Sequence, residues 1–493
     1  MPQRYEQHER YPSMSDTRQE YRLRRLGLKQ EFKRDFDFLA SFGLSFTIGS
    51  PLVGISVGLS YAWTVGGPAA AIWGWPIGSV GLFIIGLSMA EIVSGLPSSG
   101  GPYFWSSWLA GRHGPILSYI TGWLNLYGQL GLASGNAGSA TSCLVAIVSL
   151  MTGATLSNAH MLLMQIGILV LSGAINTCPP KMVARFLALG IFVNFAGVIF
   201  LVLLLPAVAP FWQGPKFVFG TLYDRSQSPI NAPSNAYLWC QGPTIALFCI
   251  AGFDCCSHIS EETKGADSST PLAILWSIAA AGVVGYVMLL GMLFCVQDPD
   301  PASLLDPDAA LGGYVAGQLV WDCFAARYGT GRMSVSVLGL FALSAVMCTV
   351  ATLTSNSRCL FSFSRSKGVP FSGFCNRLTG IMLRCIGRIP ILCRLTISRT
   401  SFEPGPFHLG SFSAAVGWTA IAWILTASVL MCLPTAVPMP LDNSPIWLAI
   451  VLGGSLTAWF LPRFGVKKRY LDPRQQAAAA AITPSNLIRL GTI

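Results

Sequence analysis

Two short stretches of the chain combine helix-breaking residues with polar groups inside otherwise apolar sequence. They are Gly49-Ser50-Pro51-Leu52-Val53-Gly54 and Ala251-Gly252-Phe253-Asp254. Proline removes a backbone donor and clashes with the preceding turn, and glycine permits unwinding. A broken helix exposes N–H groups that attract a carboxylate and carbonyl groups that attract an ammonium group. A zwitterion-binding site and a simple proline kink are the two alternatives. The candidate binding residues are Gly49, Ser50, Pro51, Gly54, Gly252, Phe253 and Asp254.

Ionisable residues follow the second break and suggest proton transfer or gating. Asp254 is the acid placed deepest in an apolar stretch, where ionisable groups are costly and usually functional. It either contacts an amine or a proton, or it caps the second half of a broken helix. His258 either relays protons or packs at the membrane interface. Glu261 and Glu262 either form gate salt bridges or belong to a solvated loop, and Glu91 is a further candidate for gating or proton transfer.

A third group of polar residues lies within one apolar stretch, 115–151. It contains Asn125, Gln129 and Asn136, and Gln129 follows Asn125 by one helical turn. These amides either line a substrate path or hydrogen-bond neighbouring helices. Asn125 and Gln129 are kept as candidates for substrate binding.

The elements that must position these residues are membrane-spanning helices. Of the 493 residues, 52% are hydrophobic and 11% are charged, whereas soluble domains carry roughly 25% charged residues. A helix needs about 20 apolar residues to cross a bilayer. The uncharged runs are too long and too uniformly apolar for the alternating strands of a barrel. Ten spans are predicted, at 38–64, 66–90, 115–151, 161–177, 186–210, 241–262, 271–297, 333–357, 409–441 and 445–462.

The distribution of positive charge predicts the topology and argues against nucleic acid as a partner. The net charge is +10, but with the N-terminus inside, nearly all of the 31 Lys and Arg residues fall in cytoplasmic segments. This is the positive-inside asymmetry of membrane proteins. We expect a multi-pass protein in the lipid bilayer with both termini cytoplasmic, 1–35 being a disordered tail and 464–493 a second tail. The four external exceptions are Lys216, Arg225, Arg327 and Arg332.

Several other chemistries lack their motifs. The sequence contains no G-x-x-x-x-G-K-[ST] loop, which argues against ATP-driven transport, and no H-E-x-x-H zinc motif. No convincing nucleophile elbow occurs, and the scattered cysteines show no metal-ligand spacing with histidine. We therefore expect no cofactor, no metal and no enzymatic activity.

The two interrupted spans are five spans apart, as two five-helix inverted repeats of a transporter would place them.

Five segments in the same order resemble fungal amino-acid permeases. They are EIVSGLPSSGGPYFW at 91–105, GWLNLYGQLG at 122–131, GFDCCSHISEETK at 252–264, TSNSRCLFSFSRSKGVPFS at 354–372 and PFHLG at 406–410. The chain is thereby similar to the amino acid/choline transporter branch of the amino acid–polyamine–organocation superfamily, which includes GABA permeases and choline transporters.

This resemblance implies a fold and an activity. The fold is an all-α, LeuT-like pair of inverted five-helix repeats followed by two further helices. The activity is secondary transport of an amino acid, GABA or a related amine, coupled to an ion that is commonly H⁺, or alternatively of choline. Gly49–Gly54 would bind the carboxylate end, and Gly252, Phe253 and Asp254 would form the opposite wall. The plasma membrane is the expected location, with the vacuolar membrane as the alternative.

One segment departs from the family pattern. Residues 373–408 replace family helices nine and ten with a stretch that holds five arginines, which cannot cross a bilayer cheaply. It is either a basic cytoplasmic or interfacial segment or the product of a faulty gene model. The predicted layout is then a core at 36–372 with eight spans, this basic segment, and two C-terminal spans within 409–463. A transport-inactive, truncated or regulatory membrane protein is the alternative to a functional transporter.

Overall fold

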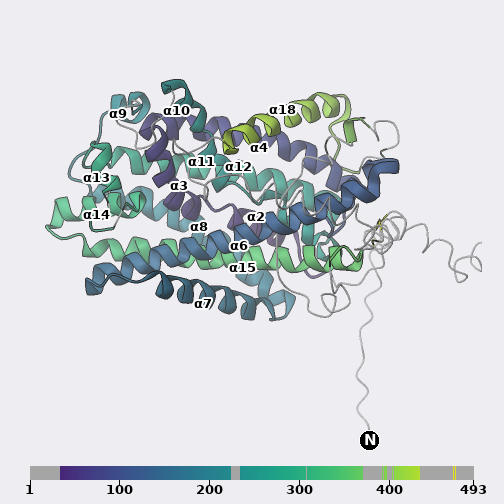
Figure 1. Ribbon diagram of the computed structural model, residues 1–493, viewed down its shortest axis with the longest axis horizontal. Coiled ribbons are helices and arrows are strands. Elements are labelled where there is room, and N and C mark those ends of the chain that lie inside the picture. Colours follow the sequence, from purple (N-terminus) through teal and green to yellow (C-terminus); the bar gives the residue numbers. More distant parts are fainter. Residues whose placement is uncertain are drawn as a thin grey trace, which may run out of the picture.

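The fold is a bundle of long helices that lie alongside one another (Figure 1). It is described from a computed structural model. The described residues are 34–223 and 234–369 (apart from 307 and 312), 391, 394–396, 402, 405–432, 470 and 472–473. No strand pairing beyond one isolated bridge occurs among them, so the all-α prediction is confirmed.

Nine stretches of the described residues are long and apolar enough to cross a membrane. They correspond to the first nine predicted spans, and the tenth, 445–462, lies outside the described residues. Five of them are single long helices: α4 (Gly67–Gly95), α7 (Asn158–Asn176), α8 (Pro180–Val208), α12 (Ala266–Phe294) and α18 (Ser413–Cys432). Two more are α6 (Gly114–Thr152) and α15 (Val335–Arg365), each preceded by a short 3₁₀ turn, η1 (Gly111–His113) and η3 (Arg332–Ser334). The remaining two are interrupted.

The first interrupted span consists of α2 (Phe38–Ile48) and α3 (Pro51–Val65). Asp37 caps α2, because its carboxylate accepts a hydrogen bond from the Ala40 N–H at 2.9 Å. Ser50 is the N-cap of α3, and Pro51 occupies the first helical position, where the missing N–H costs no hydrogen bond. The predicted break between Gly49 and Pro51 is confirmed.

The second interrupted span has three parts, α10 (Asn235–Gln241), α11 (Thr244–Cys249) and the 3₁₀ helix η2 (Phe253–Glu262). Gly252 precedes η2 and has a backbone φ of 101°. This is a left-handed conformation that residues other than glycine adopt only with strain. The predicted break at Ala251–Gly252 is therefore confirmed, and the second part of the span is a 3₁₀ helix.

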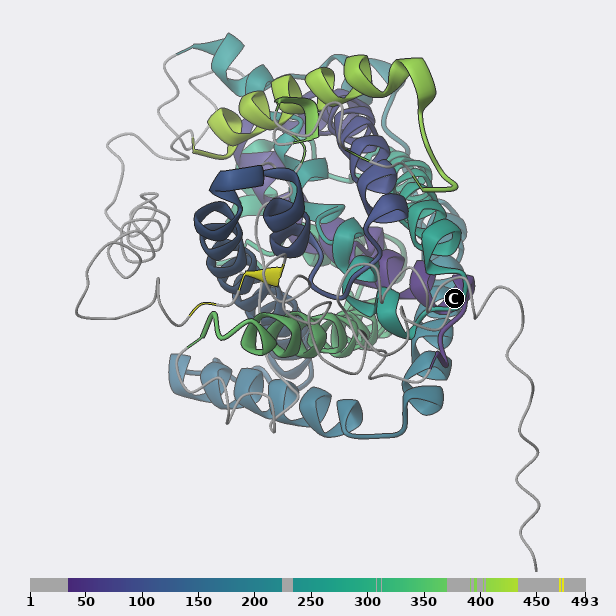
Figure 2. The same cartoon turned by 90° about the vertical axis from the view of Figure 1, so that its right-hand side faces the viewer.

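The helices that surround the breaks form layers. Figure 2 shows the bundle turned by 90°, with α18 and α7 on opposite sides and the first interrupted span in the middle. Helices α6 and α15 lie side by side, α12 and α18 both pack against α4, and α8 packs against α2. Short helices complete the described part: α5 (Pro102–Leu109), α9 (Pro215–Gly220), α13 (Pro301–Leu305), α14 (Val315–Tyr328) and η4 (Gly410–Phe412).

One end of the bundle carries most of the buried charge, and we call it the charged end. It is defined by Glu91, Glu261, Glu262, Arg358 and Arg365. Most of the predicted basic segment 373–408 lies outside the described residues. Of its described residues, Arg394 lies at the charged end, 3.8 Å from the Glu91 carboxylate and over the Phe402 ring.

A piece of the C-terminal segment is anchored at the charged end. The Tyr470 hydroxyl lies 2.6 Å from Ser118 Oγ, and its ring lies 5.4 Å from that of Tyr119. Asp472 accepts a hydrogen bond from the Ser107 hydroxyl. The Tyr470 side chain is buried, so these contacts join the C-terminal segment to α5 and α6.

We expect Tyr470→Ala to destabilise the protein by about 3 kcal/mol, because it removes a buried ring and the partner of Ser118. The measurement is the thermal unfolding of the purified protein in detergent. Tyr328→Ala is the control, since Tyr328 is 52% exposed, and it should cost less than about 1 kcal/mol. Equal losses in the two variants would show that the C-terminal anchor contributes nothing.

Candidate functional site

The two breaks face each other inside the bundle. A side-chain carbon placed on Gly49 would lie 3.4 Å from the carbonyl oxygens of both Ile250 and Ala251. Across the same gap, the Ser45 hydroxyl donates to the Phe253 carbonyl at 2.9 Å and accepts from the Cys256 N–H at 3.1 Å. The hydroxyl thereby satisfies backbone groups that the unwound segment releases, and it ties α2 to η2.

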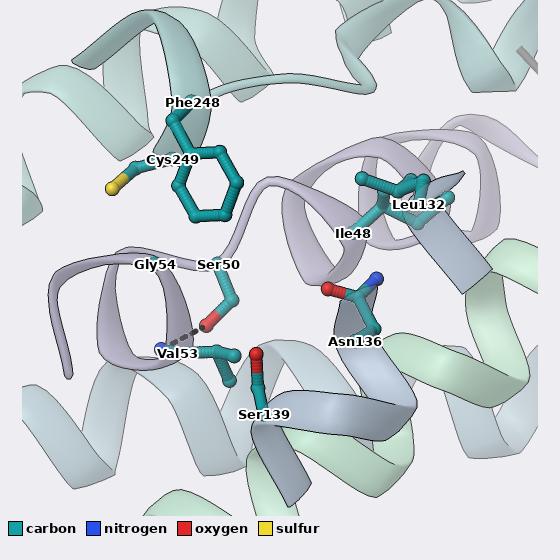
Figure 3. Close-up of a pocket in the computed structure, with 9 residues that line it drawn as sticks. All are labelled: Ile48, Ser50, Val53, Gly54, Leu132, Asn136, Ser139, Phe248 and Cys249. Atoms are coloured by element: carbon teal, nitrogen blue, oxygen red, sulfur yellow. Dashed lines mark hydrogen bonds between the residues drawn. The ribbon is translucent and has the colours of Figure 1, made fainter. Parts of the chain in front are cut away.

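A pocket lies beside the first break, between α3, α6 and α11 (Figure 3). It is small and partly open: about 330 Å³ of space holds no atoms when the solvent at its mouth is included, and about 30 Å³ can take the centre of a water-sized molecule. The break, α6 and the end of α11 contribute its nine lining residues: Ile48, Ser50, Val53, Gly54, Leu132, Asn136, Ser139, Phe248 and Cys249.

The polar groups of the pocket are neutral and oriented. Ser50 Oγ accepts from the Val53 N–H at 3.4 Å, in the first turn of α3. The Asn136 amide donates to Thr352 Oγ1 at 3.0 Å, which leaves its carbonyl oxygen for the pocket, where Figure 3 places the side chain. None of the nine lining residues is acidic or basic. The N-terminus of α3 favours negative charge, whereas the C-terminus of α11 favours positive charge.

The structure distributes the predicted binding residues between the pocket and its surroundings. Ser50 and Gly54 line the pocket, and Gly49 and Pro51 form the break that borders it. Of the three amides on α6, Asn136 lines the pocket, while Asn125 and Gln129 do not. The assignment of Asn125 and Gln129 to substrate binding therefore remains a prediction without support from the pocket geometry.

Gly252, Phe253 and Asp254 form the start of η2, outside the pocket lining. No side chain caps η2, so the alternative role of Asp254 as a capping residue is wrong, because Gly252 occupies the N-cap position and Asp254 lies within the first turn. The Asp254 side chain is half-buried. It lies near Cys256 and Cys359.

His258 belongs to a buried polar cluster that includes Asn125. Its Nδ1 lies 2.9 Å from the Ser99 carbonyl, which only accepts hydrogen bonds, so this nitrogen carries the proton. Its Nε2 faces the Asn125 amide at 3.5 Å, and that amide also donates to the Cys359 thiol. The Gln129 amide donates to the Cys255 thiol. Both amides thus contact neighbouring elements.

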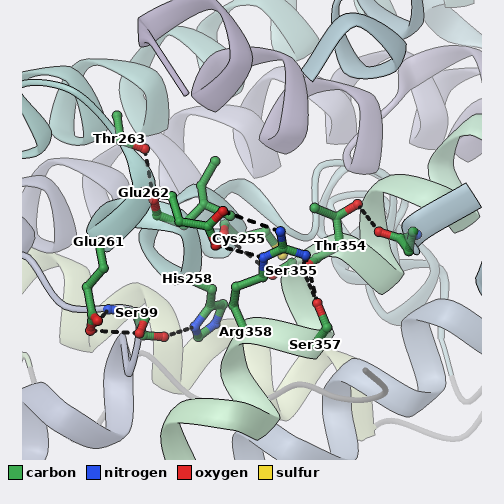
Figure 4. Close-up of polar contacts among 12 residues, drawn as sticks. Ser99, Cys255, His258, Glu261, Glu262, Thr263, Thr354, Ser355, Ser357 and Arg358 are labelled. Atoms are coloured by element: carbon green, nitrogen blue, oxygen red, sulfur yellow. Dashed lines mark hydrogen bonds and ion pairs between the residues drawn. The ribbon is translucent and has the colours of Figure 1, made fainter. Parts of the chain in front are cut away.

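Glu261 and Glu262 form buried ion pairs with α15 at the charged end, and Figure 4 shows the pair of Glu262 with Arg358. Glu262 binds Arg358 through two contacts, of 2.9 and 3.4 Å. Glu261 binds Arg365 at 3.2 Å and accepts from the backbone N–H and the hydroxyl of Ser99, at 3.0 and 2.7 Å. Both glutamates are nearly inaccessible to solvent, so the solvated-loop alternative is wrong. The predicted salt bridges are present, and their role in gating stays a prediction.

Two further contacts close the charged end. The Phe36 N–H donates to the Glu262 carbonyl at 3.1 Å, and the Lys264 N–H donates to the Phe36 carbonyl at 2.9 Å. These bonds join the segment before α2 to the segment after η2. Glu91 accepts a hydrogen bond from the Ser413 hydroxyl and pairs with Arg394. Each predicted gating residue is therefore buried and paired with another element.

Sequence patterns alone did not reveal several residues of this region. Ser139 follows Asn136 by three positions and shares its helical face, which is a weak signal in a serine-rich stretch. Arg358 and Arg365 occupy the last turns of α15, where basic residues are common for other reasons. No cluster of three or more histidine, cysteine or acidic residues that could hold a metal occurs in the described part of the chain.

Two facing helix breaks, a small neutral pocket and a closed charged end define a class of membrane protein, the multi-pass transporter with discontinuous helices. The amino acid permease family model matches residues 36–379. The chain belongs to this family.

Relatives support the same assignment. An "Amino-acid permease BAT1 homolog" from Oryza sativa subsp. japonica is 33% identical, over 89% of this chain and 93% of the relative. The amino-acid permease BAT1 of Arabidopsis thaliana is 32% identical over the same shares. A GABA-specific permease of Saccharomyces cerevisiae is 28% identical, over 84% of this chain and 78% of the relative. These relatives are named as permeases, which are transporters and not enzymes.

We expect Gly54→Ala to reduce amino-acid uptake by more than about tenfold, because overpacking of this kind costs 1–3 kcal/mol. The new methyl group would lie 2.6 Å from Cys249 Cβ and 2.8 Å from its Cα, so α11 would have to move. Uptake per molecule at the cell surface is the measurement.

Gly135→Ala on α6 is the matched control, since nothing lies within 4 Å of its added carbon. Normal uptake by Gly54→Ala would contradict the close contact between α3 and α11 at the pocket.

Proposed function

We propose that this chain is a secondary active permease that moves small amino acids, GABA among them, across a membrane, and that an ion gradient drives this transport. The neutral pocket between the end of α11 and the start of α3 supports this proposal most directly. An α- or γ-amino acid carries one charge of each sign, and the two helix termini offer complementary partial charges. We place both chain termini in the cytoplasm and the protein in the plasma membrane.

The pocket favours an amino acid over choline. A quaternary ammonium ion is usually held by several aromatic rings or a carboxylate, whereas Phe248 is the single aromatic residue in the pocket lining. Choline has no carboxylate for the first turn of α3. The same neutral lining disfavours substrates with a net charge, because a buried charge needs a charged partner.

The charged end acts as the inner gate in this proposal. The ion pairs Glu262–Arg358 and Glu261–Arg365 join η2 to α15 and lie at the end of η2 that is away from the second break. Release of substrate to the cytoplasm requires these pairs to separate and to become hydrated. Since breaking a buried pair is costly, the closed state persists until binding at the breaks displaces η2.

Protons are the proposed coupling ion, with Asp254 as the proposed acceptor. Its carboxylate is half-buried at the first turn of η2, between the breaks and the inner gate. None of the hydrogen bonds and ion pairs found for the described residues involves it. Neutralisation of this group would change the charge at the point where η2 must move.

The substrate is tested by competition in vesicles that contain the purified protein under an imposed pH gradient. We expect saturable uptake of at least one radiolabelled amino acid from a panel that includes GABA. Unlabelled GABA or glycine should compete, whereas choline at the same concentration should leave uptake unchanged, because it lacks a carboxylate. Competition by choline alone would identify a choline transporter, and absence of any uptake would favour a transport-inactive protein.

The gate is tested by exchanging the charges of one pair. Arg358→Glu alone places two acids side by side and should reduce uptake by more than about tenfold, as expected for loss of a buried pair. The double variant Arg358→Glu/Glu262→Arg should restore uptake to within about threefold, because the coupling energy is recovered.

Arg332→Glu is the control for the change in charge, since Arg332 is exposed in η3, the 3₁₀ turn that precedes α15. All uptake values are divided by surface abundance. A double variant no more active than Arg358→Glu would show that the pairing itself is not required.

A further inference from the structure

Three buried polar side chains from three different elements meet behind the first break. They are Ser50 at the break, Asn194 on α8 and Ser344 on α15, and all are fully buried. The Ser50 hydroxyl donates to Asn194 Oδ1, and the Ser344 hydroxyl donates to the same oxygen at 2.8 Å. One amide oxygen with two lone pairs thus accepts both hydroxyl groups.

The orientation of the Asn194 amide is determined by its own helix. Its Nδ2 donates to the Gly190 carbonyl at 2.8 Å, one turn earlier in α8. This bond fixes which end of the amide faces the break, so the oxygen points to Ser50. The amide nitrogen therefore donates to Gly190 within α8, and the amide oxygen accepts from the residues at the break.

The face of α8 that carries Asn194 packs closely against the residues on both sides of the first break. A side-chain carbon added to Gly190 would lie 2.7 Å from Thr47 Oγ1, and one added to Gly197 would lie 2.8 Å from Leu52 Cδ2. The three α8 residues are spaced by four and three positions and share one helical face. Asn194 thus lies beside the unwound residues, with a glycine on either side for close approach to α2 and α3.

Ser50 links this contact to the pocket. Its oxygen accepts from the Val53 N–H in the first turn of α3 and also lines the pocket, while its proton is directed to Asn194. Loss of the Asn194 acceptor would free the Ser50 hydroxyl to rotate and to donate elsewhere. The first turn of α3 would then lose its fixed position relative to α8 and α15.

We propose that Asn194 is a positioning residue for substrate binding, which acts through Ser50 by holding the N-terminus of α3 in its carboxylate-binding orientation. The proposal rests on the proposed function, because it assumes that α3 binds the substrate carboxylate. It adds a residue outside the pocket whose side chain determines affinity without touching the substrate.

The test is a double-mutant cycle with Ser50→Ala and Asn194→Leu, read as KM and maximal rate of uptake per surface molecule. The substrate is the best-transported amino acid of the panel. Leucine keeps the branched shape and the number of side-chain heavy atoms of asparagine, and it removes both the acceptor and the amide donor. We expect each single variant to raise KM about tenfold, with a smaller change in maximal rate, as loss of one buried hydrogen bond predicts.

The double variant should raise KM no further than the larger single effect, because both substitutions break the same bond. Asn194→Asp should remain within about threefold of the wild-type KM, since a buried carboxyl stays neutral and can both donate and accept. Ser344→Ala should also remain within about threefold, because the bond between Ser50 and Asn194 does not require the Ser344 hydroxyl.

Multiplicative effects of the two substitutions on KM would overturn the proposal. So would an Asn194→Leu variant that has a lowered melting temperature and an unchanged KM, which is the result expected of a purely structural residue. A wild-type protein without saturable amino-acid uptake would refute the proposed function, and this inference with it. Wild-type uptake with an uncoupled cycle would refute this inference alone.

Discussion

The structure depends on how the backbone groups released at two helix breaks find partners inside a membrane. An unpaired N–H or carbonyl in hydrocarbon costs several kcal/mol, so broken helices persist only where protein or a cavity covers them. Here the breaks cover each other: Gly49 lies against the carbonyls of Ile250 and Ala251, and Ser45 bonds both to Phe253 and to Cys256. The groups that remain at the first turn of α3 border the pocket, which is the proposed substrate site.

The second break connects the pocket with the charged end. Helix η2 extends from Phe253 to Glu262 as a single 3₁₀ helix of 10 residues, about 20 Å at 2.0 Å per residue. Runs of this length are uncommon and often mark hinges. In the proposed function, a displacement at Gly252 would be transmitted along η2 to the ion pairs with Arg358 and Arg365, so that substrate binding and gate opening would share one element.

Much of the fold was predictable from sequence, because uncharged apolar runs specify spans and Gly/Pro clusters specify breaks. The site was predictable only in part. Asn125, Gln129 and Asn136 share one face of α6, but Asn136 lies about 16 Å further along the helix than Asn125, at 1.5 Å per residue. Periodicity identifies a face and not a depth, so it could not show which amide reaches the pocket. Asn194 is the single polar residue of the apolar run 186–210, whereas Ser344 is one of many serines and threonines on α15. Their contact with Ser50 arises only from tertiary packing.

The most direct test of this account is a cryo-electron microscopy structure of the protein with a transported amino acid bound. The account predicts that the carboxylate lies at the first turn of α3, beside Ser50, with the amino group toward the end of α11 and Asn136. A ligand bound instead beside Asn125 and Gln129, or one whose carboxylate is held by an arginine of the charged end, would contradict the central claim that the helix breaks form the binding site.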